Sequence, residues 1–183
     1  KTHFSWHMLT GGNAFDSFSP EVLKEETRKH PFKEAPRMKN NFTRLNFGWL
    51  GYWVPDDKTI GTQPDMLEYV TSRAAAWDCP VSLQADPESY ARHARTADNL
   101  EVIKRWEDAR AIGWLTGEQK KMLQDGSREH ILLINEKKEF ELVPYYQIQD
   151  VAGGSREIRA FTFRRNNECY VVYWHISGNR KLI

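Results

Sequence analysis

The feature that most constrains the fold is the apolar and aromatic run from Leu45 to Val54, which ends abruptly at Pro55-Asp56-Asp57. One asparagine and two glycines are its only interruptions, and polar and apolar side chains do not alternate along it. A short run of this kind is typical of a strand buried on both faces, as in parallel sheets. The sequence therefore predicts a parallel α/β core organised around residues 44–54.

A helix and a second strand follow this run. The helix is expected to begin at Gln63-Pro64 and to end before Pro80, and the short strand is Val81 to Ala85, followed by Asp86-Pro87. Apolar residues recur in the helix at spacings of three and four, which gives one apolar face; they are Met66, Leu67, Val70, Ala74 and Trp77. Strand, helix and strand in this order predict a βαβ unit with parallel pairing and a right-handed crossover.

The remaining elements are expected on both sides of this unit. Residues 2–9 predict a first strand closed by a turn at 10–13, and residues 14–41 form a polar segment with a short helix from Pro20 that ends before Pro31. After a polar loop at 87–96, a helix is expected from Asp98 to Ile112, and then a short helix that begins with a capping box, Thr116 to Gln119. Beyond Gly126 the pattern changes to short strands at 131–135, 140–143, 146–151, 158–164 and 170–176.

Two domains follow from this change of pattern. Residues 1–126 are expected to be α/β and residues 127–183 to be an antiparallel β domain. The chain begins at Lys1 directly in a presumed strand and stops on apolar residues, so we expect it to be a piece of a longer protein.

Charge and composition exclude several classes of protein. The net charge is +1 over 183 residues with acids and bases interspersed, which argues against a nucleic-acid or anionic-membrane surface. No run approaches the roughly 20 apolar residues of a membrane span. Cys79 and Cys169 have no CxxC partner, so they predict neither a zinc site nor a disulfide scaffold.

Alternation along the strands separates polar from apolar side chains. Ser82, Gln84 and Asp86 oppose Val81, Leu83 and Ala85, as His3, Ser5 and His7 oppose Phe4, Trp6 and Met8. Buried polar rows need partners, and the interior of a closed barrel supplies them; Asn46, Gly48, Leu50 and Tyr52 are expected on the same inward side. His3 and His7 are about 13 Å apart along a strand, too far for one ion, so no metal site is expected. No glycine-rich phosphate loop opens a helix, and no cofactor is expected.

Carboxylates after the strands are the strongest lead to chemistry. Asp56 and Asp86 each follow a presumed parallel strand, where barrel enzymes hold general acids and bases, whereas Asp57 is interpreted as a turn residue. Trp6, Tyr52 and Trp53 offer aromatic faces nearby, and carboxylates beside such faces suit a sugar substrate. The alternative is turn chemistry alone, since aspartate beside proline is common in turns.

The segments THFSWHML, NFGWLGYW, PDMLEYVTSRAAAWDCPVSL and NLEVIKRWEDAR, with the β-rich tail, resemble the C-terminal portion of bacterial (β/α)8-barrel glycoside hydrolase-like proteins. The resemblance implies that residues 2–9, 45–54 and 81–85 are the last three barrel strands and that residues 127–183 are an accessory β domain. It also implies a secreted or periplasmic location. Such families usually carry an acid after the fourth strand, which this chain does not include, and the end of the presumed sixth strand offers His7 in place of a carboxylate.

The function expected from these features is hydrolysis of a glycosidic bond. Asp86 and Asp56 are the candidate catalytic carboxylates, and Trp6, His7, Tyr52 and Trp53 are the candidate substrate-binding residues. The expected partners are a carbohydrate and the rest of the barrel from the same longer protein. The alternatives are a carbohydrate-binding or interaction module without catalysis, which would use an exposed aromatic row (Tyr145, Tyr146, Tyr170, Tyr173 and Trp174), and a structural domain without a ligand.

Overall fold

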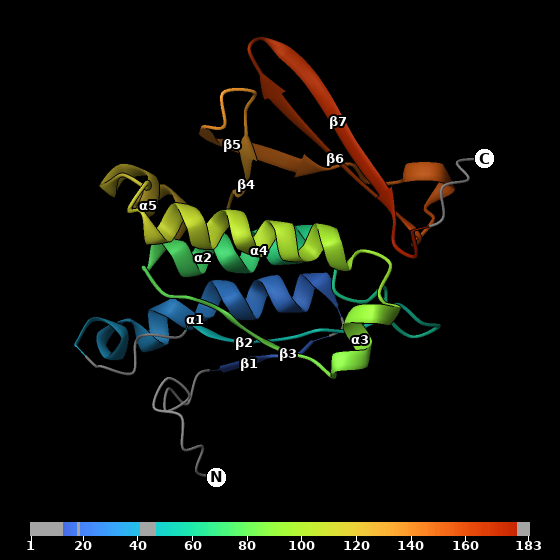
Figure 1. Cartoon of the computed structure of the whole chain (residues 1–183), viewed down its shortest axis with the longest axis horizontal. Coiled ribbons are helices and arrows are strands. Elements are labelled where there is room, and N and C mark those ends of the chain that lie inside the picture. The colour runs from blue at the N-terminus through green and yellow to red at the C-terminus, as the bar shows by residue number, and fades with distance from the viewer. Residues whose placement is uncertain (1–12, 18, 41–46, 179–183) are drawn as a thin grey trace.

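The structure, a computed structural model, describes residues 13–17, 19–40 and 47–178, and it is a mixed α/β fold in which helices lie between two sheets (Figure 1). In chain order the elements are β1 (Asn13–Phe15), α1 (Pro20–Asn40), β2 (Gly48–Gly51), α2 (Pro64–Ala76), β3 (Ser82–Gln84), α3 (Pro87–Arg92), α4 (Thr96–Ala111), α5 (Gly117–Gln124), β4 (Glu129–Ile134), β5 (Phe140–Gln147), a short 3₁₀ helix (Val151–Gly153), β6 (Ile158–Arg165) and β7 (Glu168–His175).

The first sheet is parallel and has the order β1-β2-β3. The predicted parallel pairing of the strands within residues 45–54 and 81–85 is confirmed. The expected strand at residues 2–9 lies outside the described residues. Residues 13–15, assigned from the sequence to a turn and a polar segment, instead form β1, because Phe15 is buried between the sheet and α1, where its ring packs against His30 and Phe47.

The register of this sheet decides which side chains enter the core. Phe15, Leu50 and Leu83 stand side by side and pack against α1 and α2, in a cluster that includes Leu23 and Leu67. The expectation that Leu50 faces the polar side is therefore wrong, because its partner Leu83 lies on the apolar side of β3. Trp49, Ser82 and Gln84 lie on the opposite face, which no described helix covers (Figure 1).

The helices agree with the sequence in type and differ in extent. The predicted helix at Gln63-Pro64 is confirmed as α2, with Asp65 in its first turn. Helix α1 does not end before Pro31 but continues to Asn40. A proline inside a helix costs about 3 kcal/mol, which is a local penalty that packing can offset, and the first turns of α1 bury Leu23 and Thr27 completely.

Capping explains two further helix starts. The predicted capping box is confirmed: the hydroxyl of Thr116 accepts a hydrogen bond from the backbone N–H of Gln119, whose side chain accepts one from the N–H of Thr116. The expected loop at residues 87–96 is wrong in its first half, because Asp86 caps the short helix α3. Aspartate followed by proline is a helix-start signal that the sequence does contain.

The second sheet is antiparallel, with the order β4-β5-β6-β7. It has four strands where the sequence suggested five, because residues 140–143 and 146–147 belong to one strand that runs through Pro144. Pro144 pairs with β4, and the β6 pairing starts only at the next residue, so its missing N–H breaks no ladder with β6. The predicted turn at Asn166-Asn167 is confirmed, and both residues have positive φ.

The two sheets share one helical layer. Strand β4 lies against α2, where the N–H of Leu132 donates to Glu68 and its carbonyl accepts from Arg105. Leu132 on β4 belongs to the same apolar cluster as Leu67 on α2, on the other side of the expected boundary near residue 126. The described strands form open sheets, and no closed barrel is present among the described residues.

Candidate active site

One cavity lies at the carboxyl ends of the parallel strands. Its volume is about 620 Å³. Its lining residues come from the last residues of β2 and β3, from the loops that follow β1, β2 and β3, and from α3; they are Asp16, Gly51, Tyr52, Trp53, Val54, Pro55, Asp56, Gln84, Ala85, Asp86, Ser89 and Arg92. Parallel strands that run side by side end at the same edge of the sheet, so the segments that follow them meet there. This brings Asp56, Asp86 and Trp53, from the sequence-predicted set, to one cavity.

Asp56 is held in a tight turn after β2. Its Oδ1 accepts hydrogen bonds from the backbone N–H groups of Lys58 at 2.8 Å and Thr59 at 2.9 Å. These two donors lower the pKa of Asp56 below its usual range. Asp56 is therefore an ionised carboxylate with one oxygen fixed by the turn, suited to accepting a hydrogen bond or stabilising positive charge and unsuited to donating a proton.

Asp86 has a second structural role beside its place in the cavity. Its Oδ1 accepts the backbone N–H of Glu88 at 3.3 Å, which caps α3. The side chain is exposed, so a ligand can reach it. The carboxylate thus combines helix capping with access to the cavity.

Trp53 forms one wall of the cavity and is fixed from two sides. Its indole N–H donates to the backbone carbonyl of Asp16 at 3.2 Å, which joins the loops after β2 and β1. A Cβ at Gly51 would lie 2.6 Å from the indole nitrogen and 3.2 Å from the Cα of Asp16. Glycine at position 51 therefore allows the close approach of Trp53, as expected for a strand glycine near a functional edge.

Tyr52 lines the cavity, but its ring is not at the surface. The residue is 3% exposed, its ring packs against Tyr90 and His93, and its hydroxyl lies 2.8 Å from Thr96 Oγ1 and 3.2 Å from Asn99 Nδ2. The expectation that this ring stacks on a ligand is not supported by this placement. Alternation along the chain puts position 52 on the same side as Leu50, which packs against the helices.

The remaining predicted site residues cannot be placed in the cavity, and two lining residues were not predicted from the sequence. Trp6 and His7 lie outside the described residues. Asp16 and Arg92 line the cavity and were not predicted, because each follows or ends an element that the sequence did not reveal, β1 and α3 respectively. Recognising Asp86-Pro87 as a helix start would have placed Arg92 on the short helix that follows β3.

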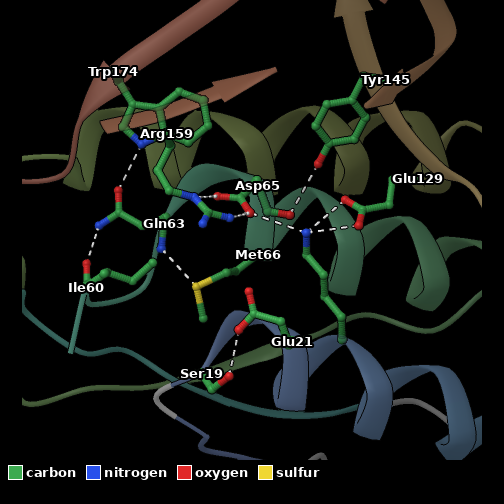
Figure 2. A network of polar contacts seen from close by, with 11 residues as sticks. Ser19, Glu21, Ile60, Gln63, Asp65, Met66, Glu129, Tyr145, Arg159 and Trp174 are labelled. Carbon is green, nitrogen blue, oxygen red and sulfur yellow. Dashed lines mark hydrogen bonds and ion pairs between the residues drawn. The ribbon is translucent and has the colours of Figure 1, made fainter. Parts of the chain in front are cut away.

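A second group of charged residues is buried at the junction of α1, α2 and the antiparallel sheet (Figure 2). Asp65 Oδ2 lies 2.5 Å from Arg159 Nη2 and 3.4 Å from Lys24 Nζ, and Lys24 also pairs with Glu129. Burial alone would raise the pKa of Asp65, but Lys24 and Arg159 reverse this and lower it. Because the partners of Asp65 are other side chains of the fold and its own side chain is fully buried, we interpret this group as structural.

Glu68 is a third carboxylate with an altered environment. Burial raises the pKa of Glu68 to about 7, although Arg105, the indole N–H of Trp106 and the N–H of Leu132 all favour its charged form. It lines a groove of about 510 Å³ between α2, α4 and the antiparallel sheet. All of its partners lie within the fold, so it ties β4 to the helices.

Metal sites and membrane-spanning helices are both absent from the described residues. No group of three or more histidine, cysteine, aspartate or glutamate side chains there could hold a metal ion. None of the described helices has the length and apolar character needed to cross a membrane. No protein-family model, curated protein or solved structure matches the chain, so these comparisons assign no family.

Proposed function

We propose that the strand-end cavity binds a carbohydrate, and that the chain is the C-terminal part of a (β/α)8-barrel glycoside hydrolase-like protein whose strand-end carboxylates act on a glycosidic bond. One observation carries the proposal. Trp53, Asp56 and Asp86 follow two neighbouring parallel strands and line the same cavity. Carboxylates accept hydrogen bonds from sugar hydroxyls, and an indole ring stacks on the C–H face of a pyranose.

The two carboxylates suit different roles in such a reaction. Asp56 stays ionised because two backbone N–H groups stabilise its charge, so it fits a nucleophile, a base or a hydroxyl acceptor. Asp86 is exposed and accepts a single long hydrogen bond, which leaves it for the acid/base role. Arg92, on the same wall, fits hydrogen bonding to a sugar hydroxyl or carboxylate.

One face of the parallel sheet is not covered by any described helix, which supports the proposal that further β/α units complete a barrel. Parallel sheets occur almost only with both faces covered. Here α1 and α2 cover one face, while the other presents Trp49, Ser82 and Gln84. This mixture of aromatic and polar side chains suits the interior of a barrel, where polar groups pair with one another or with substrate.

The test uses the complete protein and substitutions that preserve local structure. Asn at position 86 still caps a helix, and Asn at position 56 still forms the turn, so Asp86→Asn and Asp56→Asn remove charge alone. Each should lower kcat/KM on a glycoside panel by about 100-fold or more with an unchanged melting temperature. Asp57→Asn, next in sequence and outside the cavity lining, is the matched control and should be neutral. Unchanged turnover in both Asp86→Asn and Asp56→Asn would reject the assignment.

A second candidate function is carbohydrate binding without catalysis on the antiparallel sheet. Of the aromatic row predicted from the sequence, Tyr145 is buried and Tyr170 and Trp174 are half-buried, but Tyr146 and Tyr173 are 58% and 51% exposed. The register places these two rings on the same face of the sheet. If this face is the binding site, Tyr146→Ala should abolish saccharide binding while Asp86→Asn leaves it intact.

A further inference from the structure

The two edge strands of the antiparallel sheet, β4 and β7, differ in how far the rest of the fold bonds to their backbone groups. At the β4 edge, the N–H and carbonyl of Leu132 bond to Glu68 and Arg105, and the carbonyl of Arg128 accepts from Arg73. Helix side chains therefore bond to part of this edge, at Arg128 and Leu132. Strand β7 is the other edge, and Figure 1 shows it as the outermost strand of the sheet.

Hydrogen bonds fix which backbone groups of β7 point outward. The N–H of Ile176 donates to the carbonyl of Glu157, and the hydroxyl of Thr162 donates to the carbonyl of Tyr170. The backbone N–H and C=O groups of even-numbered β7 residues therefore point toward β6. The backbone groups of odd-numbered residues point away from β6, which agrees with the hydrogen bond from Arg95 Nε to the carbonyl of His175. The outward N–H and carbonyl groups of Cys169, Val171 and Tyr173 bond to no described residue.

The central side chains of β7 offer no protection against pairing. Natural edge strands are usually guarded by lysine, proline, a bulge or short length. Strand β7 has eight residues, and positions 169–174 (CYVVYW) contain no charged residue, no proline and no glycine. Val171 is 57% exposed, so an apolar side chain stands at the middle of the open edge.

We propose that β7 is a dimerisation strand that pairs antiparallel with β7 of a second copy of this chain, with Val171 opposite the partner's Val171. With the two-fold axis at Val171, this residue lies opposite its own counterpart, and its neighbours on one side lie opposite the partner's neighbours on the other side, so a charge in the middle of the strand would lie close to its own copy. The absence of charge from positions 169–174 suits that arrangement.

The pairing register is determined by which outward backbone groups of β7 are free. In an antiparallel pair, outward-facing residues must pair with outward-facing residues. With the axis at Val171, Cys169 pairs with the partner's Tyr173, and all the free groups of Cys169, Val171 and Tyr173 are satisfied. With the axis at Val172, Cys169 would pair with the partner's His175. The carbonyl of His175 already accepts hydrogen bonds from Arg95 and from the N–H of Gly178. Of these two registers, the one with the axis at Val171 fits the free backbone groups.

Sedimentation of the 183-residue chain from micromolar to millimolar concentration tests the dimer. A monomer–dimer equilibrium is expected, and Val171→Pro should raise the dissociation constant by about 10- to 100-fold, since it removes an outward N–H from each copy. Because that N–H makes no bond to β6, the variant should keep the far-UV spectrum of the monomer. Tyr146→Lys is the matched control: it removes an exposed apolar side chain on β5, away from the edge, and should leave dimerisation unchanged.

Two residue-resolved measurements test the register. The amides of Val171 and Tyr173 should gain hydrogen-exchange protection as concentration rises, while that of Val172 is protected throughout. In a Cys169→Ser background, Val171→Cys should cross-link under oxidation and Val172→Cys should not. A monomer at every concentration, protection of Val171 that does not depend on concentration, or a dimer unaffected by Val171→Pro would overturn the proposal.

Discussion

Asp65 and Glu68 lie one turn apart on α2 and are both buried, yet their pKa values move in opposite directions. Burial raises the pKa of both, but Asp65 has two cationic partners, Lys24 and Arg159, and its pKa falls below the usual range. Glu68 has Arg105 alone, and its pKa rises to about 7. The number of cations around each carboxylate explains the difference.

Glu68 should make stability depend on pH. Its carboxyl binds a proton more tightly in the folded state than the ordinary value of 4.5 allows, so the native state is favoured below pH 4.5 and loses stability as pH rises from 4.5 to about 7. The loss is at most about 3 kcal/mol. Urea unfolding between pH 5 and 8 measures it, and Glu68→Gln should flatten the slope in this range. Equal slopes in both proteins would contradict the assignment.

Asp65 should be among the most sensitive positions for stability. Asp65→Asn leaves Lys24 and Arg159 buried beside each other without a shared carboxylate, and loss of one partner from a buried pair typically costs about 3–5 kcal/mol. Chemical denaturation measures the change. Glu25→Gln is the control, because Glu25 also has two cationic partners, Arg28 and Lys29, but on the surface; no measurable change is expected there. Similar losses in both variants would show that burial is not the cause.

At the scale of elements, Tyr52 joins the end of β2 to α4. Tyr52→Phe removes the hydroxyl bonded to Thr96 and Asn99 and leaves a buried amide short of a partner, so it should destabilise the fold by about 1–3 kcal/mol. Tyr90→Phe is the matched control, since the Tyr90 ring packs on Tyr52 but no hydrogen bond of its hydroxyl is found within the described structure. Thermal unfolding compares the two, and equal effects would contradict the role of the Tyr52 hydroxyl.

The sequence predicted the elements whose signals are local. The apolar run before Pro55, the spacing in α2 and the capping box at Thr116 each depend on a few neighbouring residues, and all correspond to observed elements. The predictions of secondary structure were wrong where residues far apart in the sequence determine the structure. Strand β1 is only three residues long and depends on its pairing with β2, and β5 continues through Pro144 because of where its partner strands start.

The same distinction applies to the candidate site. Asp56 and Asp86 could be assigned to one edge because parallel strands end together, and the structure places both at one cavity. The burial of Tyr52 depends on α3, which was not predicted from the sequence. The ion pair of Asp65 with Arg159 joins residues 94 positions apart, and no pattern in either segment signals it.

At the scale of the whole molecule, one helical layer supports two sheets with different exposed regions. The parallel sheet presents a carboxylate-bearing cavity at its strand ends, and the antiparallel sheet presents a free edge at β7. The proposed carbohydrate site and the proposed dimer contact therefore lie on different sheets. Asp86→Asn should change only the first and Val171→Pro only the second.

The most direct test of the carbohydrate proposal is an amide and indole chemical-shift titration of this chain with a panel of mono- and oligosaccharides. The indole N–H of Trp53 is the reporter, because it donates to the carbonyl of Asp16 at the wall of the cavity. We predict saturable shifts of this indole and of the amides around Asp56 and Asp86, lost in Asp86→Asn. Shifts confined to Tyr146 and Tyr173 on the antiparallel sheet, or no saturable shift with any saccharide, would contradict the account.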